Sequence, residues 1–92
     1  MRHIETVLVV DDDPDWLEFL TKAVESEYSA TTATNGEEAL RRMAKERPDV
    51  VIMDVMMPGG KDGFTLFAEL QARPEYRDIP VIMLTEVNQK TN

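Results

Sequence analysis

The chain has 92 residues and a mass of 10.5 kDa, enough for one small domain and too little for two, so residues 1–92 are expected to form one domain. Ten Lys and Arg against eighteen Asp and Glu give a net charge of −8, which argues against direct binding of DNA or RNA. The absence of Cys excludes disulfides, thiolate zinc sites and cysteine nucleophiles, and it is typical of a reducing cytoplasm.

The first predicted element is a strand over residues 7–10. Val7-Leu8-Val9-Val10 is a continuous apolar run, which is typical of a strand buried on both faces, as in a parallel sheet. The run is too short for a signal peptide or a membrane span. We therefore expect a cytoplasmic protein that does not associate with membranes.

A helix is predicted over Pro14–Glu27. Asp13 is a favoured N-cap residue, and Pro14 suits the first helical position. Trp16 and Phe19 are three residues apart, or about 300° around the helix axis, so we expect them on opposite sides of the apolar stripe. One of the two aromatic side chains should then reach the surface.

The following segments continue the alternation of strands and helices. Tyr28–Ala33 is predicted to be a more polar strand. Asn35, followed three residues later by Glu38, resembles a capping box and predicts the start of a second helix that ends before Pro48. The later predicted elements are a strand at Val50–Met53, a helix that begins at Phe64 and a strand at Val81–Leu84.

This order of elements predicts an α/β fold, in which a doubly wound parallel sheet carries helices on both faces. The pattern stops after the strand Val81–Leu84, and the polar segment 88–92 is too short to cover it. We therefore expect that no following helix covers this strand.

Acidic side chains follow two of the buried strands. Asp11 and Asp12 come directly after the first strand, and Asp54 follows the third. The carboxyl ends of parallel strands meet at one edge of the sheet, where two unit charges about 4 Å apart repel by roughly 4 kcal/mol at an effective dielectric near 20. A bound cation relieves this repulsion, and oxygen ligands without His or Cys favour Mg²⁺, or Mn²⁺ in its place.

Some of these acidic and polar residues have simpler interpretations. Asp13 precedes Pro14 and is better explained as a helix cap than as a metal ligand. Thr85 ends the fourth strand at the same edge, where its hydroxyl could serve the site, but it is equally typical of an ordinary strand residue.

Three segments carry a specific resemblance: VLVVDDD, VIMDVMMPGGKDGF and PVIMLTE. In order and spacing they resemble the response-regulator receiver domain, the CheY-like module of two-component signalling. The resemblance implies a flavodoxin-like sheet of order 2-1-3-4-5, with Asp54 as the phosphoacceptor. It also implies a Mg²⁺ site in which Asp12 binds directly, Asp11 binds through water and Met56 contributes its carbonyl, with Thr85 as the switch hydroxyl.

The sequence departs from that family in three places. The family continues through a last helix, strand and helix, and a Lys after its fifth strand pairs with the phosphoryl group. This chain ends before those elements, and Lys90 lies in the polar tail, so no residue is assigned as the catalytic lysine. In the strand order that the resemblance implies, loss of the fifth strand makes the fourth an unprotected edge, and we predict that the chain associates with itself through it. The loop Pro58–Gly63 is one residue longer than usual, and Glu86 stands where a small residue is common.

The leading functional hypothesis is a phosphorelay receiver that accepts a phosphoryl group on Asp54 from a sensor histidine kinase or a phosphotransfer protein. Such a module is not a turnover enzyme. The alternative is a phosphorylation-incompetent receiver, a pseudo-receiver or a truncated one, that only binds partners, and the missing Lys supports it. A phosphohydrolase is disfavoured, because such enzymes need an acid two residues after the nucleophile, where this chain has Met56.

Overall fold

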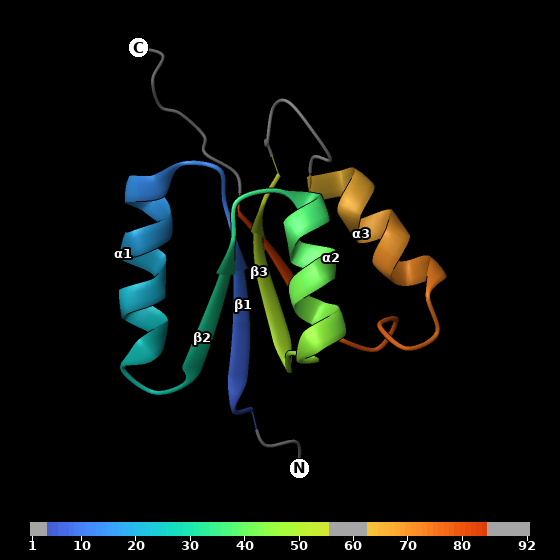
Figure 1. Cartoon of the computed structure of the whole chain (residues 1–92), viewed down its shortest axis with the longest axis horizontal. Coiled ribbons are helices and arrows are strands. Elements are labelled where there is room, and N and C mark those ends of the chain that lie inside the picture. Colours follow the sequence, from blue (N-terminus) through green and yellow to red (C-terminus); the bar gives the residue numbers. More distant parts are fainter. Residues whose placement is uncertain (1–3, 56–62, 85–92) are drawn as a thin grey trace.

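The computed structural model of the chain describes residues 4–55 and 63–84 (Figure 1). Strands and helices alternate along the chain, as the sequence predicts. The elements are β1 (Thr6–Val10), α1 (Pro14–Glu25), β2 (Ser29–Ala33), α2 (Gly36–Lys45), β3 (Val50–Asp54), α3 (Gly63–Ala72) and β4 (Val81–Leu84). Wherever the sequence predicts the end of a helix or strand, the observed end lies within two residues of it.

The four strands form one parallel sheet in the order β2-β1-β3-β4. Val10 pairs with Ala33 on one side and with Met53 on the other, so the carboxyl ends of β1, β2 and β3 lie level. Asp54 pairs with Leu84 of β4 at the same level. The predicted doubly wound parallel sheet is confirmed, and its carboxyl edge gathers the residues that follow β1 and β3.

Alternate residues of the central strands enter two separate apolar clusters. One face of the sheet contributes Leu8, Val10, Val51 and Met53 to a core shared with α2 and α3. The opposite face contributes Val7, Val9 and Val50, and there Leu17, Leu20 and Val24 of α1 pack against them. Because both faces are covered, β1 and β3 are apolar without alternation, which is the origin of the continuous runs in the sequence.

The helix starts agree with the predicted caps, with one difference in detail. Asp13 Oδ1 accepts hydrogen bonds from the amides of Asp15 and Trp16, and Asn35 Oδ1 accepts one from the amide of Glu38 at 2.8 Å. The Glu38 carboxylate does not return to the cap residue. It accepts from the amide and hydroxyl of Thr34, one residue earlier, and these bonds lower the pKa of Glu38.

The expectation that Trp16 and Phe19 lie on opposite sides of the apolar stripe of α1 is wrong. Trp16 and Phe19 are both exposed, at 37% and 60%, and their rings stack with centroids 5.1 Å apart. A separation of about 300° is also one of about 60° in the other direction, so residues three apart are neighbours on the helix surface. The two rings therefore form one exposed aromatic pair instead of flanking the apolar stripe.

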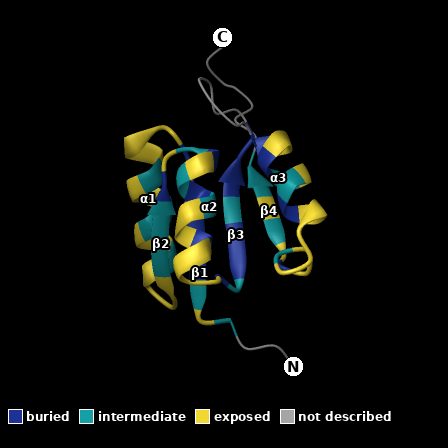
Figure 2. Cartoon of the chain, turned by 45° about the vertical axis from the view of Figure 1, so that its right-hand side comes forward, coloured by how far each residue is buried: buried dark blue, intermediate teal, exposed yellow. Residues whose placement is uncertain are grey.

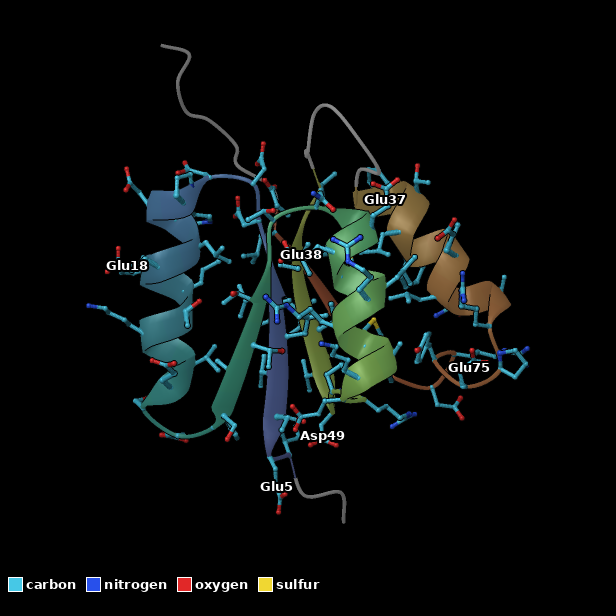
Figure 3. All side chains as sticks on the ribbon, in the orientation of Figure 1. Glu5, Glu18, Glu37, Glu38, Asp49 and Glu75 are labelled. Carbon is cyan, nitrogen blue, oxygen red and sulfur yellow. The ribbon has the colours of Figure 1, made fainter. Side chains whose placement is uncertain are left out.

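At the opposite, amino-terminal edge of the sheet, the Asp49 carboxylate binds the backbone at the start of β1. No local sequence signal marks this residue. Asp49 Oδ2 accepts hydrogen bonds from the amides of Glu5 and Thr6, at 2.9 and 3.0 Å, and from the Thr6 hydroxyl at 3.3 Å (Figure 3). These bonds fix the start of β1 against the residue before β3. The Asp49 carboxylate thus differs from the acids that follow β1 at its other end, because backbone amides donate hydrogen bonds to it.

The edge strand β4 is less buried than its neighbour β3 (Figure 2). Val81 and Met83 pack against the core beneath α3, whereas Ile82 points to the other face and is 50% exposed. Among the described residues, α1 is the only helix that packs on that face. The described part thus has four strands and three helices, without the last helix, strand and helix of the family fold.

Candidate functional site

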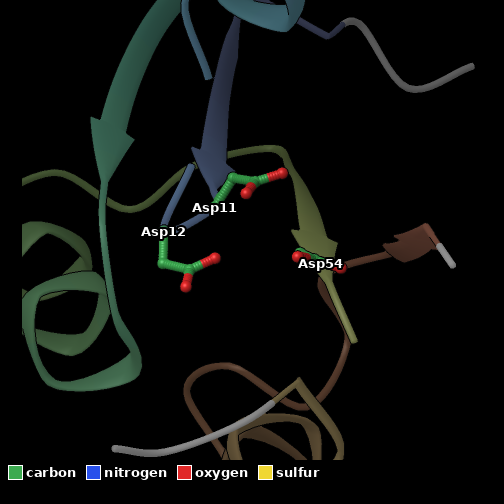
Figure 4. A group of neighbouring side chains, drawn as sticks. All are labelled: Asp11, Asp12 and Asp54. Carbon is green, nitrogen blue, oxygen red and sulfur yellow. The ribbon is translucent and has the colours of Figure 1, made fainter. Parts of the chain in front are cut away.

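Three carboxylates converge at the carboxyl edge of the sheet (Figure 4). Asp11 and Asp12 lie in the connection from β1 to α1, and Asp54 is the last residue of β3. One oxygen from each side chain lies within 4.8 Å of the other two. The sequence prediction that these acids meet is therefore confirmed, and the pairing of β1 with β3 is what brings them together.

Asp11 is the most enclosed member of the cluster, with 1% of its surface exposed. Its Oδ1 accepts a hydrogen bond from the amide of Asp13 at 3.0 Å, and its own amide donates to the carbonyl of Ala33 at 3.1 Å. Its other oxygen, Oδ2, is buried and has no hydrogen-bond donor among the described residues. A buried carboxylate oxygen without a donor is costly, so this atom marks a position that suits a cation or an ordered water.

The surroundings of Asp11 favour its protonated form. Burial, together with the charges of Asp54, Asp12 and Asp13, raises the pKa of Asp11 to about 6, and the hydrogen bond from the Asp13 amide limits the shift. A cation beside the carboxylate would reverse this balance, because an opposite charge favours the ionised form.

The donor set of the cluster fits a divalent cation of the Mg²⁺ or Mn²⁺ type. All three groups offer hard carboxylate oxygens, and no other combination of His, Cys, Asp and Glu in the described segments converges in this way. Asp11 and Asp54 are buried, whereas Asp12 is exposed, so the cluster opens toward solvent on one side. A cation that retains several waters could therefore enter and keep part of its hydration.

Asp13 lies next to the cluster but has a different role. Its carboxylate caps α1 through the amides of Asp15 and Trp16. This confirms its interpretation as a helix cap. Two other predicted site residues, Met56 and Thr85, lie outside the described residues, as do residues 58–62 of the lengthened loop and Glu86.

Comparison with known proteins assigns the family. The profile described as "Response regulator receiver domain" matches residues 7–92. The chain belongs to the response regulator receiver domain family. Among curated relatives of this receiver domain, "Response regulator PleD" of Caulobacter vibrioides is 40% identical over 83 residues, and "Heme response regulator HssR" of Staphylococcus aureus is 46% identical over 79 residues.

Solved structures of receiver domains also match in fold. The N-terminal domain of a response regulator receiver protein from Methanoculleus marisnigri has a TM-score of 0.85 and 36% identity, over 97% of this chain and 72% of that one. Chemotaxis response regulator CheY4 of Vibrio cholerae has a TM-score of 0.82 and 33% identity, over 94% and 72% of the two chains. The predicted CheY-like fold is therefore confirmed.

The chain spans only part of the length of the curated relatives that it matches. The matched residues make up 89% of this chain but 18% of PleD, and 85% of this chain but 34% of HssR. Receiver domains are signalling modules that bind Mg²⁺ at an acidic pocket and interact with histidine kinases or phosphotransfer proteins. None of the helices in the described ranges is long and apolar enough to cross a membrane.

Proposed function

We propose that residues 1–92 form a receiver domain that accepts a phosphoryl group on Asp54 in a Mg²⁺-dependent reaction. The donor is the phosphohistidine of a sensor histidine kinase or of a phosphotransfer protein, and the compartment is the cytoplasm. The observation that carries the proposal is the convergence of Asp11, Asp12 and Asp54, together with the buried oxygen of Asp11 that lacks a donor.

In the proposed reaction, a carboxylate oxygen of Asp54 attacks the phosphorus in line with the leaving imidazole. A phosphorus–oxygen bond forms as the phosphorus–nitrogen bond breaks, and the imidazole leaves with the electron pair and takes up a proton. Mg²⁺, when bound, supplies positive charge opposite the phosphoryl oxygens. Asp12 would hold the cation directly and Asp11 would hold it through water, while Asp54 is oriented by its place at the end of β3.

The family resemblance adds two residues to this proposal. By that resemblance, the carbonyl of Met56 would be a further Mg²⁺ ligand, and the Thr85 hydroxyl would donate a hydrogen bond to the phosphoryl group. The chain is assigned no catalytic lysine.

Phosphorylation of the whole chain by acetyl phosphate, with and without Mg²⁺, tests the proposal directly. Intact-protein mass spectrometry should detect a phosphorylated species only in the presence of Mg²⁺. Binding of beryllofluoride, which replaces the phosphoryl group on a carboxylate, provides a second measurement. Failure of both reactions at saturating Mg²⁺ would select the phosphorylation-incompetent alternative.

The affinity for Mg²⁺ should fall steeply below about pH 6. Metal binding requires ionised carboxylates, and Asp11 holds its proton up to about pH 6 because its pKa is raised. One competing proton with this pKa weakens the apparent affinity about tenfold at pH 5 relative to pH 7. Isothermal titration calorimetry across this range measures the effect.

Asp11→Asn is the matched control for that titration, because the amide keeps the size of the side chain and cannot ionise. The variant should bind Mg²⁺ more weakly than the native chain, and its affinity should vary much less between pH 5 and pH 7. An affinity of the native chain that is the same at both pH values would contradict the assignment of Asp11 to the metal site.

We also propose that the chain associates with itself through the side of β4 that no other strand among residues 4–55 and 63–84 pairs with. Support comes from the half-exposed Ile82 and from an apolar hollow of about 180 Å³ beside it. This hollow is lined by Ile4, Val7, Val24, Tyr28, Val50, Ile52 and Ile82. An edge strand with an apolar flank readily pairs with a second chain.

Multi-angle light scattering at tens of micromolar should show dimers or larger species. Ile82→Lys, which places a charge on the exposed side of β4, should shift the population toward monomer. Val81→Lys is not a suitable comparison, since Val81 packs on the core, so exposed Phe64→Lys on α3 serves as the control. A native chain that remains a cooperatively folded monomer would contradict the proposal.

A further inference from the structure

The backbone that follows Asp54 is held from two sides. The amide of Val55 donates to the carbonyl of Leu84 in β4 at 3.1 Å. The carbonyl of Val55 accepts from the amide of Gly63, the first residue of α3, at 2.9 Å. The end of β3 is therefore fixed by the neighbouring strand and by the start of the next helix.

Gly63 also makes a close contact that only glycine allows. A Cβ atom at this position would lie 2.5 Å from the carbonyl oxygen of Asp54 and 2.7 Å from the Cα atom of Val55. Both neighbours are backbone atoms, which cannot rotate away as the end of a flexible side chain could. Any side chain at position 63 must therefore displace α3 or the Asp54–Val55 backbone.

We propose that Gly63 is a positioning residue for the acidic cluster. By lacking a side chain, it lets α3 close onto the end of β3, and this contact holds the Asp54 carboxylate within reach of Asp11 and Asp12. The inference rests on the proposed function for the identity of the bound cation. Mg²⁺ demands near-ideal octahedral geometry, so a small displacement of one ligand weakens binding strongly.

The rest of α3 has its own attachment to the core, which separates positioning from folding. Leu66 and Leu70 are completely buried beneath this helix. They should keep α3 in place when its first residue is pushed away from β3. The damage from a side chain at position 63 should then fall mainly on the end of β3, where Asp54 lies.

Gly63→Ala, the smallest side-chain addition, tests the inference in the whole chain. Ala68→Gly is the matched control, because Ala68 is exposed in the middle of α3 and glycine there weakens the helix without adding an atom near β3. Calorimetry with Mg²⁺ and thermal unfolding are measured on both variants. We expect Gly63→Ala to weaken Mg²⁺ binding about tenfold or more, as loss of a supporting group typically does. Ala68→Gly should lower only the melting temperature.

Equal Mg²⁺ affinities of Gly63→Ala and the native chain would overturn the inference, as would an equal loss of affinity in Ala68→Gly. If Gly63→Ala does not fold, the native chain is titrated with Mg²⁺ by ¹H–¹⁵N NMR. The amide signals of Val55 and Gly63 should then shift with the same midpoint as that of Asp54, and their remaining unchanged would refute the coupling.

A metal-free measurement keeps this inference distinct from the proposed function. If the native chain binds no Mg²⁺, the proposed function fails. Amide hydrogen exchange without metal then tests whether Gly63 positions the end of β3. Gly63→Ala should then accelerate exchange at Val55, whose amide is held by Leu84, while Ala68→Gly should not. Unchanged exchange at Val55 in Gly63→Ala would show that the close contact does not position the end of β3.

Discussion

Asp54→Asn is expected to abolish phosphoryl uptake from acetyl phosphate while leaving the four-stranded sheet folded. Asn has nearly the size of Asp, but its amide is not a nucleophile and cannot form the acyl phosphate. Intact-protein mass spectrometry after incubation with acetyl phosphate and Mg²⁺ gives the yield of phosphoprotein. Circular dichroism on the same samples checks that the fold is retained.

Asp15→Asn provides the control for this substitution, because Asp15 carries an exposed acid of the same type in the first turn of α1. It should be phosphorylated like the native chain. Asp54→Asn should also be more stable than the native chain without metal, since the charge of Asp54 is one of the causes that raise the pKa of Asp11. A normal phosphoprotein yield in Asp54→Asn would exclude this residue as the acceptor.

Asp12→Ala and Asp13→Ala are expected to affect different properties, although the residues are adjacent. Asp12→Ala should weaken metal binding, and Asp13→Ala should lower stability. Asp12 belongs to the convergent cluster, so its loss should weaken Mg²⁺ binding by at least about tenfold. Asp13 caps α1, so its loss should cost about 1 kcal/mol of the free energy of unfolding. Its backbone amide, which donates to Asp11, remains present in the alanine variant.

Calorimetry and thermal unfolding of both variants form a two-by-two comparison. Asp12→Ala should keep the melting temperature of the metal-free native chain or raise it, because one repelling charge is removed. Asp13→Ala should lower the melting temperature and keep an affinity for Mg²⁺ close to the native value. Equal losses of affinity in the two variants would mean that the metal ligands have been assigned incorrectly.

The elements and the convergence of the acids could be predicted because they depend on local pattern and on general rules of topology. A continuous apolar run such as Val7–Val10 indicates a buried parallel strand, and Asp13 before Pro14 indicates a helix start. Once the sheet is parallel, residues after β1 and β3 must meet at the same edge. The position of Asp54 near Asp11 follows from these facts.

Features that depend on contacts between distant segments could not be predicted. Asp49 accepts hydrogen bonds from residues more than forty positions earlier in the chain, and no local signal marks it. Gly63 reads as an ordinary loop glycine until α3 is placed against β3. The stacking of Trp16 on Phe19 is different, because it could have been predicted: residues three apart on a helix are neighbours on its surface.

The helices on the two faces of the sheet are buried to different extents, and this should decide which part of the molecule unfolds locally first. No residue of α1 is fully buried, whereas α2 and α3 each contribute buried side chains to the larger core. Segments with few buried contacts unfold locally at low free-energy cost, so α1 should detach before the rest. Asp11 and Asp12 lie in the connection that leads into α1, and a cation bound there stabilises only the docked helix. Binding of a cation to the acidic cluster would therefore slow the local unfolding of α1 along its whole length, including residues far from the cation.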